Sequence, residues 1–172
     1  MWPEIPYEPW HETSSALHLY TQIVGKYRLA RTPWVNHSWH ATLYVNARGL
    51  TTSIIPDGPV GVEIAFDLLA HAIVGATTDG RRAGFALGPM SVAEFHARLL
   101  DLIRQLGGSP QFDGRPNEVP NPIPFRDDRQ ASPYDADAVT RFFRAIVAIN
   151  RILNQFRTGY IGGGEPSPSL LG

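Results

Sequence analysis

Hydrophobic residues recur at helical spacing in three segments of the chain. Residues 13–30 place apolar side chains three and four positions apart, and Thr13 followed by Ser14 supplies an N-cap. Residues 91–106 open with a Ser-x-x-Glu capping box, and residues 135–156 carry a wide apolar stripe. The pattern therefore predicts three helices, each with one buried side.

Between the first two helices the hydrophobic period changes to two, which is typical of strands. In residues 38–46 one face of the predicted strand carries His40, Thr42 and Tyr44, and the opposite face begins with Trp39. Further strands are expected at residues 50–55, 60–66, 70–78 and 83–88. The links between them are short and therefore join antiparallel neighbours, because parallel strands need long crossovers.

These elements predict an α+β fold, in which an antiparallel meander of about five strands has three helices packed on one face. Residues 1–158 are expected to form a single domain. Its proline- and aromatic-rich start, residues 1–12, is expected to pack on it as an extended arm. Residues 159–172 show no period and are expected to be a disordered or frayed tail.

Composition narrows the classes of function. The 172 residues carry 15 basic and 16 acidic side chains, so nucleic acid is not an expected partner. There is no cysteine, which excludes thiol catalysis, disulfides and thiolate metal sites. The longest apolar tract, residues 60–76, is interrupted by charged side chains and is too polar to cross a bilayer. With no signal-peptide pattern at the start, the sequence predicts a cytoplasmic protein without a membrane partner.

Four strings of the chain form a distinctive combination. They read WPEIPYEPWHETSSALHLYTQIVGKYRLA, NHSWHATLYVNARGLTTSIIP, FDLLAHAIVGATTDG and PNEVPNPIPFRDD. Together they resemble an uncharacterised bacterial family that is catalogued only as a domain of unknown function, and the resemblance runs from Trp2 to about Phe156. It implies a shared fold and a set of suspect residues, but no reaction.

The end of the chain departs from the pattern of that family. Its members continue with a segment similar to Gly-Lys-x-Ser-Pro-Val-His-Phe-Phe-Trp-Gly, where this chain has residues 162–172. We therefore expect a frame-shifted, shortened member of the family, which sequencing of the encoding DNA tests. Shortening of this kind leaves apolar surface bare, so the chain is expected to form a homodimer through that surface.

His37 and His40 are the first candidates for chemistry. They lie three positions apart, which on a strand places them on opposite faces unless the start of the strand is irregular. Together with His71 they form a candidate site for zinc or another divalent metal. Further candidate ligands are Glu63, Asp67, and His11 with Glu12. No HExxH motif accompanies them. The alternative is that they are strand-edge histidines bonded to backbone groups.

The first predicted helix carries a polar stripe, because His18, Gln22 and Lys26 lie four positions apart. One interpretation is a solvated helix face. Because LHLYTQIVGK is among the family-like strings, the other interpretation aims the stripe across a cleft at the strand face that starts with His40. The catalytic candidates in this cleft are His40, His18 and Lys26, and the candidate substrate-binding residues are Gln22, Thr42, Tyr44 and Trp39.

Two functions from different classes fit this arrangement. The first is a small-molecule hydrolase, in which histidine and carboxylate groups activate water on an ester or phosphoester, with or without a divalent metal. The alternative is a non-catalytic module that binds a small ligand or dimerises. We favour the hydrolase, because acid–base and hydroxyl groups gather on surfaces that are predicted to face each other.

Overall fold

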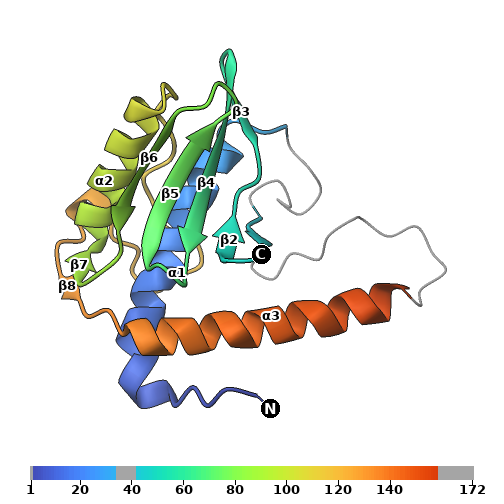
Figure 1. The fold of residues 1–172 in the computed structure, drawn as a ribbon. Helices are drawn as coiled ribbons and strands as arrows, with labels where there is room; N and C mark the ends of the chain where they lie inside the picture. The colour runs from blue at the N-terminus through green and yellow to red at the C-terminus, as the bar shows by residue number, and fades with distance from the viewer. Residues whose placement is uncertain (1, 34–41, 159–172) are drawn as a thin grey trace.

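The structure of the chain, a computed structural model, describes residues 2–33 and 42–158 (Figure 1). Its helices are α1 (Tyr7–Leu29), α2 (Val92–Gln105), α3 (Ala136–Thr158) and the short 3₁₀ helix η2 (Phe125–Asp127). Its strands are β1 (Tyr44–Val45), β2 (Gly49–Thr51), β3 (Ile55–Asp57), β4 (Val60–Asp67), β5 (Ala72–Thr77), β6 (Arg82–Ala86), β7 (Met90–Ser91) and β8 (Ala131–Ser132). None of the described helices is long and apolar enough to span a membrane.

The main sheet has six strands in the order β1-β2-β4-β5-β6, with β3 also paired to β4. All of these described pairings are antiparallel. Figure 1 shows α1 and α2 behind this sheet, whereas α3 crosses its lower end and projects beyond it. The α+β class predicted from the sequence, with an antiparallel meander and three helices, is confirmed.

The central strand β4 shows how the sequence positions the core. Val62, Ile64 and Phe66 are completely buried, while Glu63 between them is half-buried on the opposite face. This alternation is expected of an antiparallel sheet with one face covered by helices. The covering contact is aromatic, since Phe66 stacks on Phe95 of α2 with 6.2 Å between ring centroids.

Two of the predicted strands are shorter than expected. The strand predicted at residues 50–55 is split into β2 and β3, which pair with different parts of the same edge of β4. Ser53 between them has φ 54°, and the Thr52 hydroxyl accepts a hydrogen bond from the Ile64 N–H at 3.0 Å. The Thr52 side chain thus bonds a backbone N–H of β4 where the backbone pairing with β4 is interrupted, as at a β-bulge. Strand β1 is short too, and residues 38–41 of its predicted range lie outside the described residues.

Helix α1 begins at Tyr7, whereas the sequence predicts an extended arm over residues 1–12. Pro6 occupies the N-cap position and Pro9 lies in the first turn, where backbone N–H groups have no intrahelical partner to lose. Thr13 is therefore not a cap. Its buried hydroxyl donates to the carbonyl oxygen of Pro133 at 3.2 Å and ties α1 to the segment that precedes α3.

Helix α2 begins as predicted. The Ser91 hydroxyl accepts a hydrogen bond from the Glu94 N–H at 3.1 Å, which confirms the capping residue. Tyr20 of α1 stacks on Phe95 of α2 at 4.1 Å between ring centroids, and its hydroxyl donates to the carbonyl oxygen of Met90 at 3.0 Å. Burial, reinforced by the charge of Glu94, raises the pKa of Tyr20 to about 12. Tyr20 thus joins α1 to α2 through an apolar contact and to β7 through a hydrogen bond.

His96 of α2 gives a testable pH dependence. It lies half-buried against the rings of Phe112 and Phe125, and burial, together with the charge of Arg126, lowers its pKa below the ordinary value of 6.5. The unfolded chain therefore takes up this proton at a higher pH than the folded chain, so stability falls as the pH drops below 6.5. We expect the free energy of unfolding of His96→Gln, measured by urea denaturation, to fall less between neutral pH and acid pH than that of the unmodified chain. An equal dependence on pH in both proteins would contradict a lowered pKa of His96 in the folded chain.

Candidate functional site

The polar stripe of α1 faces the loop that follows α2. Lys26 is only 8 % exposed, and its Nζ donates to Asp113 Oδ2 at 2.7 Å and to Asn117 Oδ1 at 3.0 Å. The hydrogen bond from Lys26 holds the pKa of the Asp113 carboxyl below its usual range. Lys26 is therefore a cation that is already paired within the chain.

Gln22 holds the same loop through its side-chain amide. Its Oε1 accepts from the N–H of Asn117, and its Nε2 donates to the carbonyl oxygen of Asn117, each at 2.9 Å. The Nε2 also donates to His18 Nε2 at 3.1 Å, and His18 is exposed at the end of the stripe. His18, Gln22 and Lys26 thus lie side by side as predicted, but Gln22 and Lys26 anchor a loop of the same chain.

Thr42 and Tyr44 contact a different side of α1, where they meet Arg28. The two Nη atoms of Arg28 bond the carbonyl oxygen of Thr42 and, at 3.3 Å, the hydroxyl oxygen of Tyr44. The guanidinium carbon lies 4.9 Å from the centre of the Tyr44 ring. Arg28 is two residues past Lys26, which is about 200° around a helix axis. The predicted cleft is corrected accordingly: the cation beside Thr42 and Tyr44 is Arg28 and not Lys26.

The charge of Arg28 has no carboxylate partner within the described residues. Arg28 is 8 % exposed, and its Nε is buried without a hydrogen-bond acceptor in this part of the chain. The ion pairs between described residues do not include Arg28. A buried cation without a counter-charge is costly, so it is expected where a ligand supplies the missing charge.

Arg31, one turn further along the chain, shows the opposite arrangement. It is 11 % exposed, and its Nε lies 3.1 Å from Oδ2 of Asp57, which is 8 % exposed. The same oxygen accepts from the Tyr27 hydroxyl and the Ser109 N–H, both at 2.7 Å. Burial, followed by the hydrogen bond to Asp57, raises the pKa of Tyr27. This charge is fully compensated and therefore structural.

Residues 2–170 match the model of one protein family, described as a family of unknown function (DUF5996). The chain belongs to this family. Neither a curated protein nor a solved structure matches it. The resemblance to an uncharacterised family, inferred from four strings of the sequence, is thereby confirmed, whereas the frame shift near the end stays a prediction. Membership of DUF5996 assigns no reaction, so the function of the chain has to be inferred from its residues.

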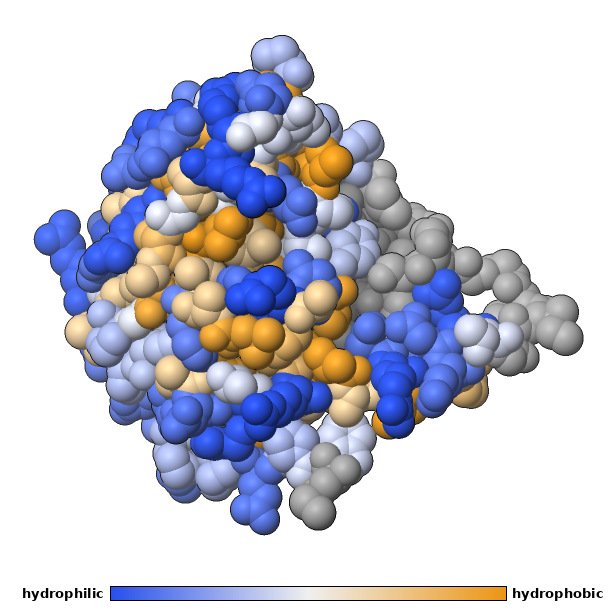
Figure 2. All heavy atoms as spheres, viewed as in Figure 1, coloured by the Kyte–Doolittle hydropathy of each residue, from blue (hydrophilic) through white to orange (hydrophobic). Residues whose placement is uncertain are grey.

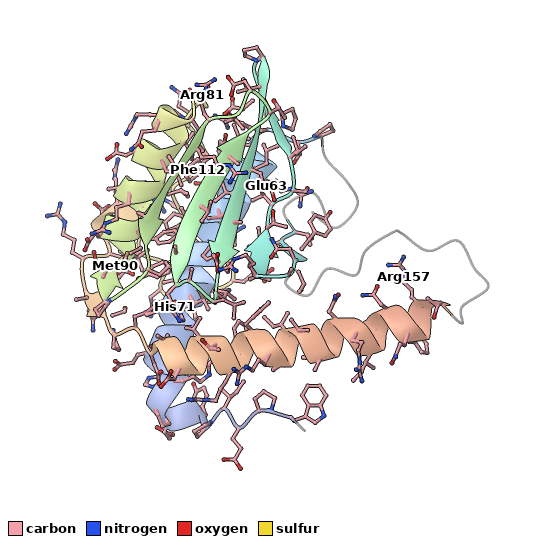
Figure 3. All side chains as sticks on the ribbon, in the orientation of Figure 1. Glu63, His71, Arg81, Met90, Phe112 and Arg157 are labelled. Atoms are coloured by element: carbon pink, nitrogen blue, oxygen red, sulfur yellow. The ribbon has the colours of Figure 1, made fainter. Side chains whose placement is uncertain are left out.

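The predicted metal ligands of the DUF5996 chain are only partly described. His37 and His40 lie outside the described residues, as does Trp39, so their contacts are not placed. His71 sits at the end of the sheet beside α3 (Figure 3), with Nδ1 2.9 Å from the Tyr134 hydroxyl. Within residues 2–33 and 42–158, no three metal-ligating side chains come together. A metal site therefore stays a prediction that depends on His37 and His40.

The two candidate carboxylate ligands are held by neighbours on the outer face of the sheet. Glu63 Oε1 accepts from the Thr51 hydroxyl at 2.5 Å. Asp67 Oδ2 pairs with Arg48 at 2.5 Å, and its Oδ1 caps the turn after β4. Hydrogen bonds from Arg48 and from the turn, acting against burial, keep the pKa of Asp67 below its usual value. Both carboxylates thus have partners on the protein surface.

Two open grooves flank this outer face, where Figure 2 shows apolar side chains gathered over β4 and β5. The larger, about 530 Å³, is lined by Val45, Asn46, Ala47, Phe143, Arg144, Val147 and Asn150. The smaller, about 360 Å³, is lined by Asn46, Ala47, Arg48, Ala65, Phe66, Asp67 and Val74. Neither contains a predicted catalytic or substrate-binding residue. The candidate site is therefore the cluster of Arg28, Thr42 and Tyr44 and not one of the two grooves.

Sequence reasoning missed Arg28, although a signal was present. Arg28 follows Val24 by four positions and Leu17 by eleven, so it continues the apolar side of the helix. A charged side chain at such a position is buried unless the helix ends first. If only the apolar residues of this side are considered, Arg28 is overlooked. The polar stripe of His18, Gln22 and Lys26, on another side of the helix, is then interpreted as the functional surface.

Proposed function

We propose that this DUF5996 chain binds a small molecule through an anionic group, a carboxylate or a phosphate, at Arg28, Thr42 and Tyr44. One observation carries the proposal: a buried guanidinium has no carboxylate partner in the described residues. Desolvating an unpaired charge costs several kcal/mol even after the protein relaxes. An anion beside Arg28 offsets that cost, so a negatively charged ligand is favoured over a neutral one.

The donors of the cluster suit a planar or tetrahedral anion. A guanidinium offers five N–H donors in a fixed fork that matches two oxygens of one carboxylate or phosphate. In Arg28 the Nη atoms bond Thr42 and Tyr44, while the Nε–H has no described acceptor. The Tyr44 ring stacks near the guanidinium and supports its orientation. Nε–H and a neighbouring Nη–H are thus the expected contacts to the ligand.

Hydrolysis of the bound molecule is the second candidate function. His40 precedes Thr42 by two residues in the sequence, which supports a role for it near the same ligand. As general base, its imidazole would take a proton from water while the water oxygen attacks the carbonyl carbon or phosphorus. The proton would then pass to the leaving alkoxide as the ester bond breaks. A divalent metal held by His37, His40 and His71 would instead lower the pKa of a bound water to about 7.

Calorimetric titration of the full chain with phosphate, phenyl phosphate and benzoate tests the binding proposal. We expect binding of at least one anion, lost in Arg28→Met and about tenfold or more weaker in Arg28→Lys, because an ammonium lacks the fork. The matched control is Lys26→Met, which removes another buried cation and should keep the affinity. The proposal would be contradicted if Arg28→Met and the unmodified chain bound the anions with equal affinity. It would also be contradicted if the unmodified chain bound none of the three anions.

Chromogenic esters and phosphoesters separate an enzyme from a non-catalytic binding module. Turnover that disappears in His40→Ala and persists in His18→Ala would support hydrolysis, since the described hydrogen bond of the His18 side chain is to Gln22 on the anchored stripe. Anion binding without turnover of any substrate would support the non-catalytic module. Elemental analysis before and after treatment with a chelator decides whether a metal takes part.

A further inference from the structure

Strand β6 forms one edge of the main sheet. It is the last strand in the order of the described sheet, and Figure 1 shows it at the margin of the sheet beside α2. Its five residues pair with β5 in one continuous register, from Arg82 opposite Ala76 to Ala86 opposite Ala72. The strand is therefore regular along its whole length. We call the side of β6 that faces away from β5 the β6 edge.

Alternate residues of β6 direct their backbone groups to this edge. The N–H of Leu87, directly after the strand, donates to the carbonyl oxygen of His71 at 2.7 Å. Because bonded and unbonded positions alternate in an antiparallel ladder, the odd-numbered residues of β6 bond to β5. The even-numbered residues are exposed, and no hydrogen bond within the described part of the chain uses their backbone groups. They are Arg82, Gly84 and Ala86.

The opposite edge of the sheet is protected against pairing, as edge strands in native proteins usually are. There the strands β1 and β3 are two and three residues long. Strand β3 also contains Pro56, which has no N–H to donate. Strand β6 is longer, contains no proline and carries a single charged side chain, Arg82, at its first position. The β6 edge is thus suited to accept a further strand.

We propose that the β6 edge pairs antiparallel with the β6 edge of a second copy of this chain, so that two sheets become one. A two-fold axis at Gly84 places this residue opposite Gly84 of the partner subunit, and Arg82 opposite Ala86 of the partner subunit. Residues at bonded positions exchange two hydrogen bonds with the residue opposite. Every N–H and C=O group that β6 directs to the edge then has a partner.

The side chains of β6 permit this register. On the outer face of the sheet two glycines meet at the axis, and the two Arg82 side chains lie at opposite ends of the contact. On the inner face Ala83 lies opposite Phe85 of the partner subunit, so that a small side chain meets a large one. The contact therefore brings together neither two bulky side chains nor two like charges.

Helix α2 flanks the β6 edge on the inner face of the sheet, where the Phe95 and Phe85 rings lie 5.6 Å apart between centroids. The pairing brings the two copies of this helix towards each other. The helix has two acidic and two basic residues, which are Glu94, Asp101, Arg98 and Arg104. Two copies of α2 thus approach without an excess of like charge.

Other strands of this chain fit the β6 edge less well. Strand β3 of another copy lacks a donor at Pro56, and β1 offers two residues against the five of β6. Pairing of β6 with either of them would also be heterologous and would continue from copy to copy. Two β6 strands match in length, and their pairing closes in a dimer.

Sedimentation and amide hydrogen exchange of the full chain, over a micromolar concentration series, test the pairing. We expect a monomer–dimer equilibrium in which the amides of Arg82, Gly84 and Ala86 exchange more slowly as the dimer forms. The exposed amide of Gly58, in the turn between β3 and β4, should keep its rate. A monomer at every concentration would overturn the proposal. So would a dimer in which the three amides exchange as fast as in the monomer.

A proline at the β6 edge tests the same hydrogen bonds by substitution. Ala86→Pro removes an N–H that bonds no described residue, so the pairing with β5 keeps its hydrogen bonds. We expect the dissociation constant to rise about tenfold or more, because the two-fold axis repeats the loss in both copies. The matched control is Ala86→Thr, which keeps the N–H and favours a strand, and should keep the equilibrium.

A second proline variant covers the case in which circular dichroism shows Ala86→Pro unfolded. Arg82→Pro removes the outward N–H at the first position of the strand, where proline is tolerated. We expect the same rise in the dissociation constant. A folded proline variant with the dissociation constant of Ala86→Thr would contradict the pairing.

Discussion

Replacing Asp57 with alanine should lower the free energy of unfolding by about 3–5 kcal/mol, the range typical of breaking a buried ion pair. Asp57 is 8 % exposed and its Oδ2 is bonded to Arg31, the Tyr27 hydroxyl and the Ser109 N–H. Removal of the carboxylate leaves the Arg31 guanidinium without its counter-charge and two further donors without an acceptor. The loss is large because three segments of the chain converge on this one oxygen.

Urea denaturation of the unmodified chain and Asp57→Ala measures this effect. The matched control is Asp79→Ala, because Asp79 pairs with Arg81 in a solvent-exposed hairpin turn, where water replaces the lost contacts. We expect the control to stay close to the unmodified chain. If both variants unfolded at the same urea concentration, the Asp57 cluster would not hold α1 against β3.

Replacing Arg28 with methionine should leave the free energy of unfolding within about 1 kcal/mol of the unmodified chain, or raise it. Methionine fills similar volume, and the substitution removes a buried charge that has no carboxylate partner in the described residues. The carbonyl oxygen of Thr42 loses a donor, which costs about 1 kcal/mol or more and opposes the gain. A residue kept for binding at the expense of stability behaves in this way.

The same substitution at Arg31 provides the comparison. Arg31→Met leaves the Asp57 carboxylate buried and without its cation, so we expect a loss of about 3–5 kcal/mol. Both arginines lie near the end of α1 and are similarly buried, and the difference between them is the counter-charge. Equal destabilisation by the two substitutions, measured by urea denaturation, would mean that Arg28 is structural.

Local patterns predicted the sheet and the helix faces well. The alternation of Val62, Ile64 and Phe66 assigns β4 and its buried side, and Ser91 caps α2 as expected. The start of α1 was missed because prolines normally end helices, whereas Pro6 and Pro9 fall where the helix has free N–H groups. Strand length was overestimated where a single residue with positive φ, Ser53, divides a continuous β pattern.

The candidate site depended on information that a local pattern does not contain. The period of the first helix correctly grouped His18, Gln22 and Lys26 on one face. Long-range packing decides which segment covers a helix face. Here the loop at Asn117 covers the face that carries Gln22. Thr42 and Tyr44 were correctly placed beside α1 but against Arg28. Tertiary packing therefore changed the partner while leaving the faces as predicted.

If the guanidinium of Arg28 holds an anion, the NMR signal of its Nε–H reports on this contact. The signal is assigned by its absence in Arg28→Lys, and that of Arg31, which is held by Asp57, serves as the internal control. We predict a saturable shift of the Arg28 signal on addition of phenyl phosphate while the Arg31 signal stays in place. An Arg28 signal that does not move at concentrations that saturate the protein would contradict the claim.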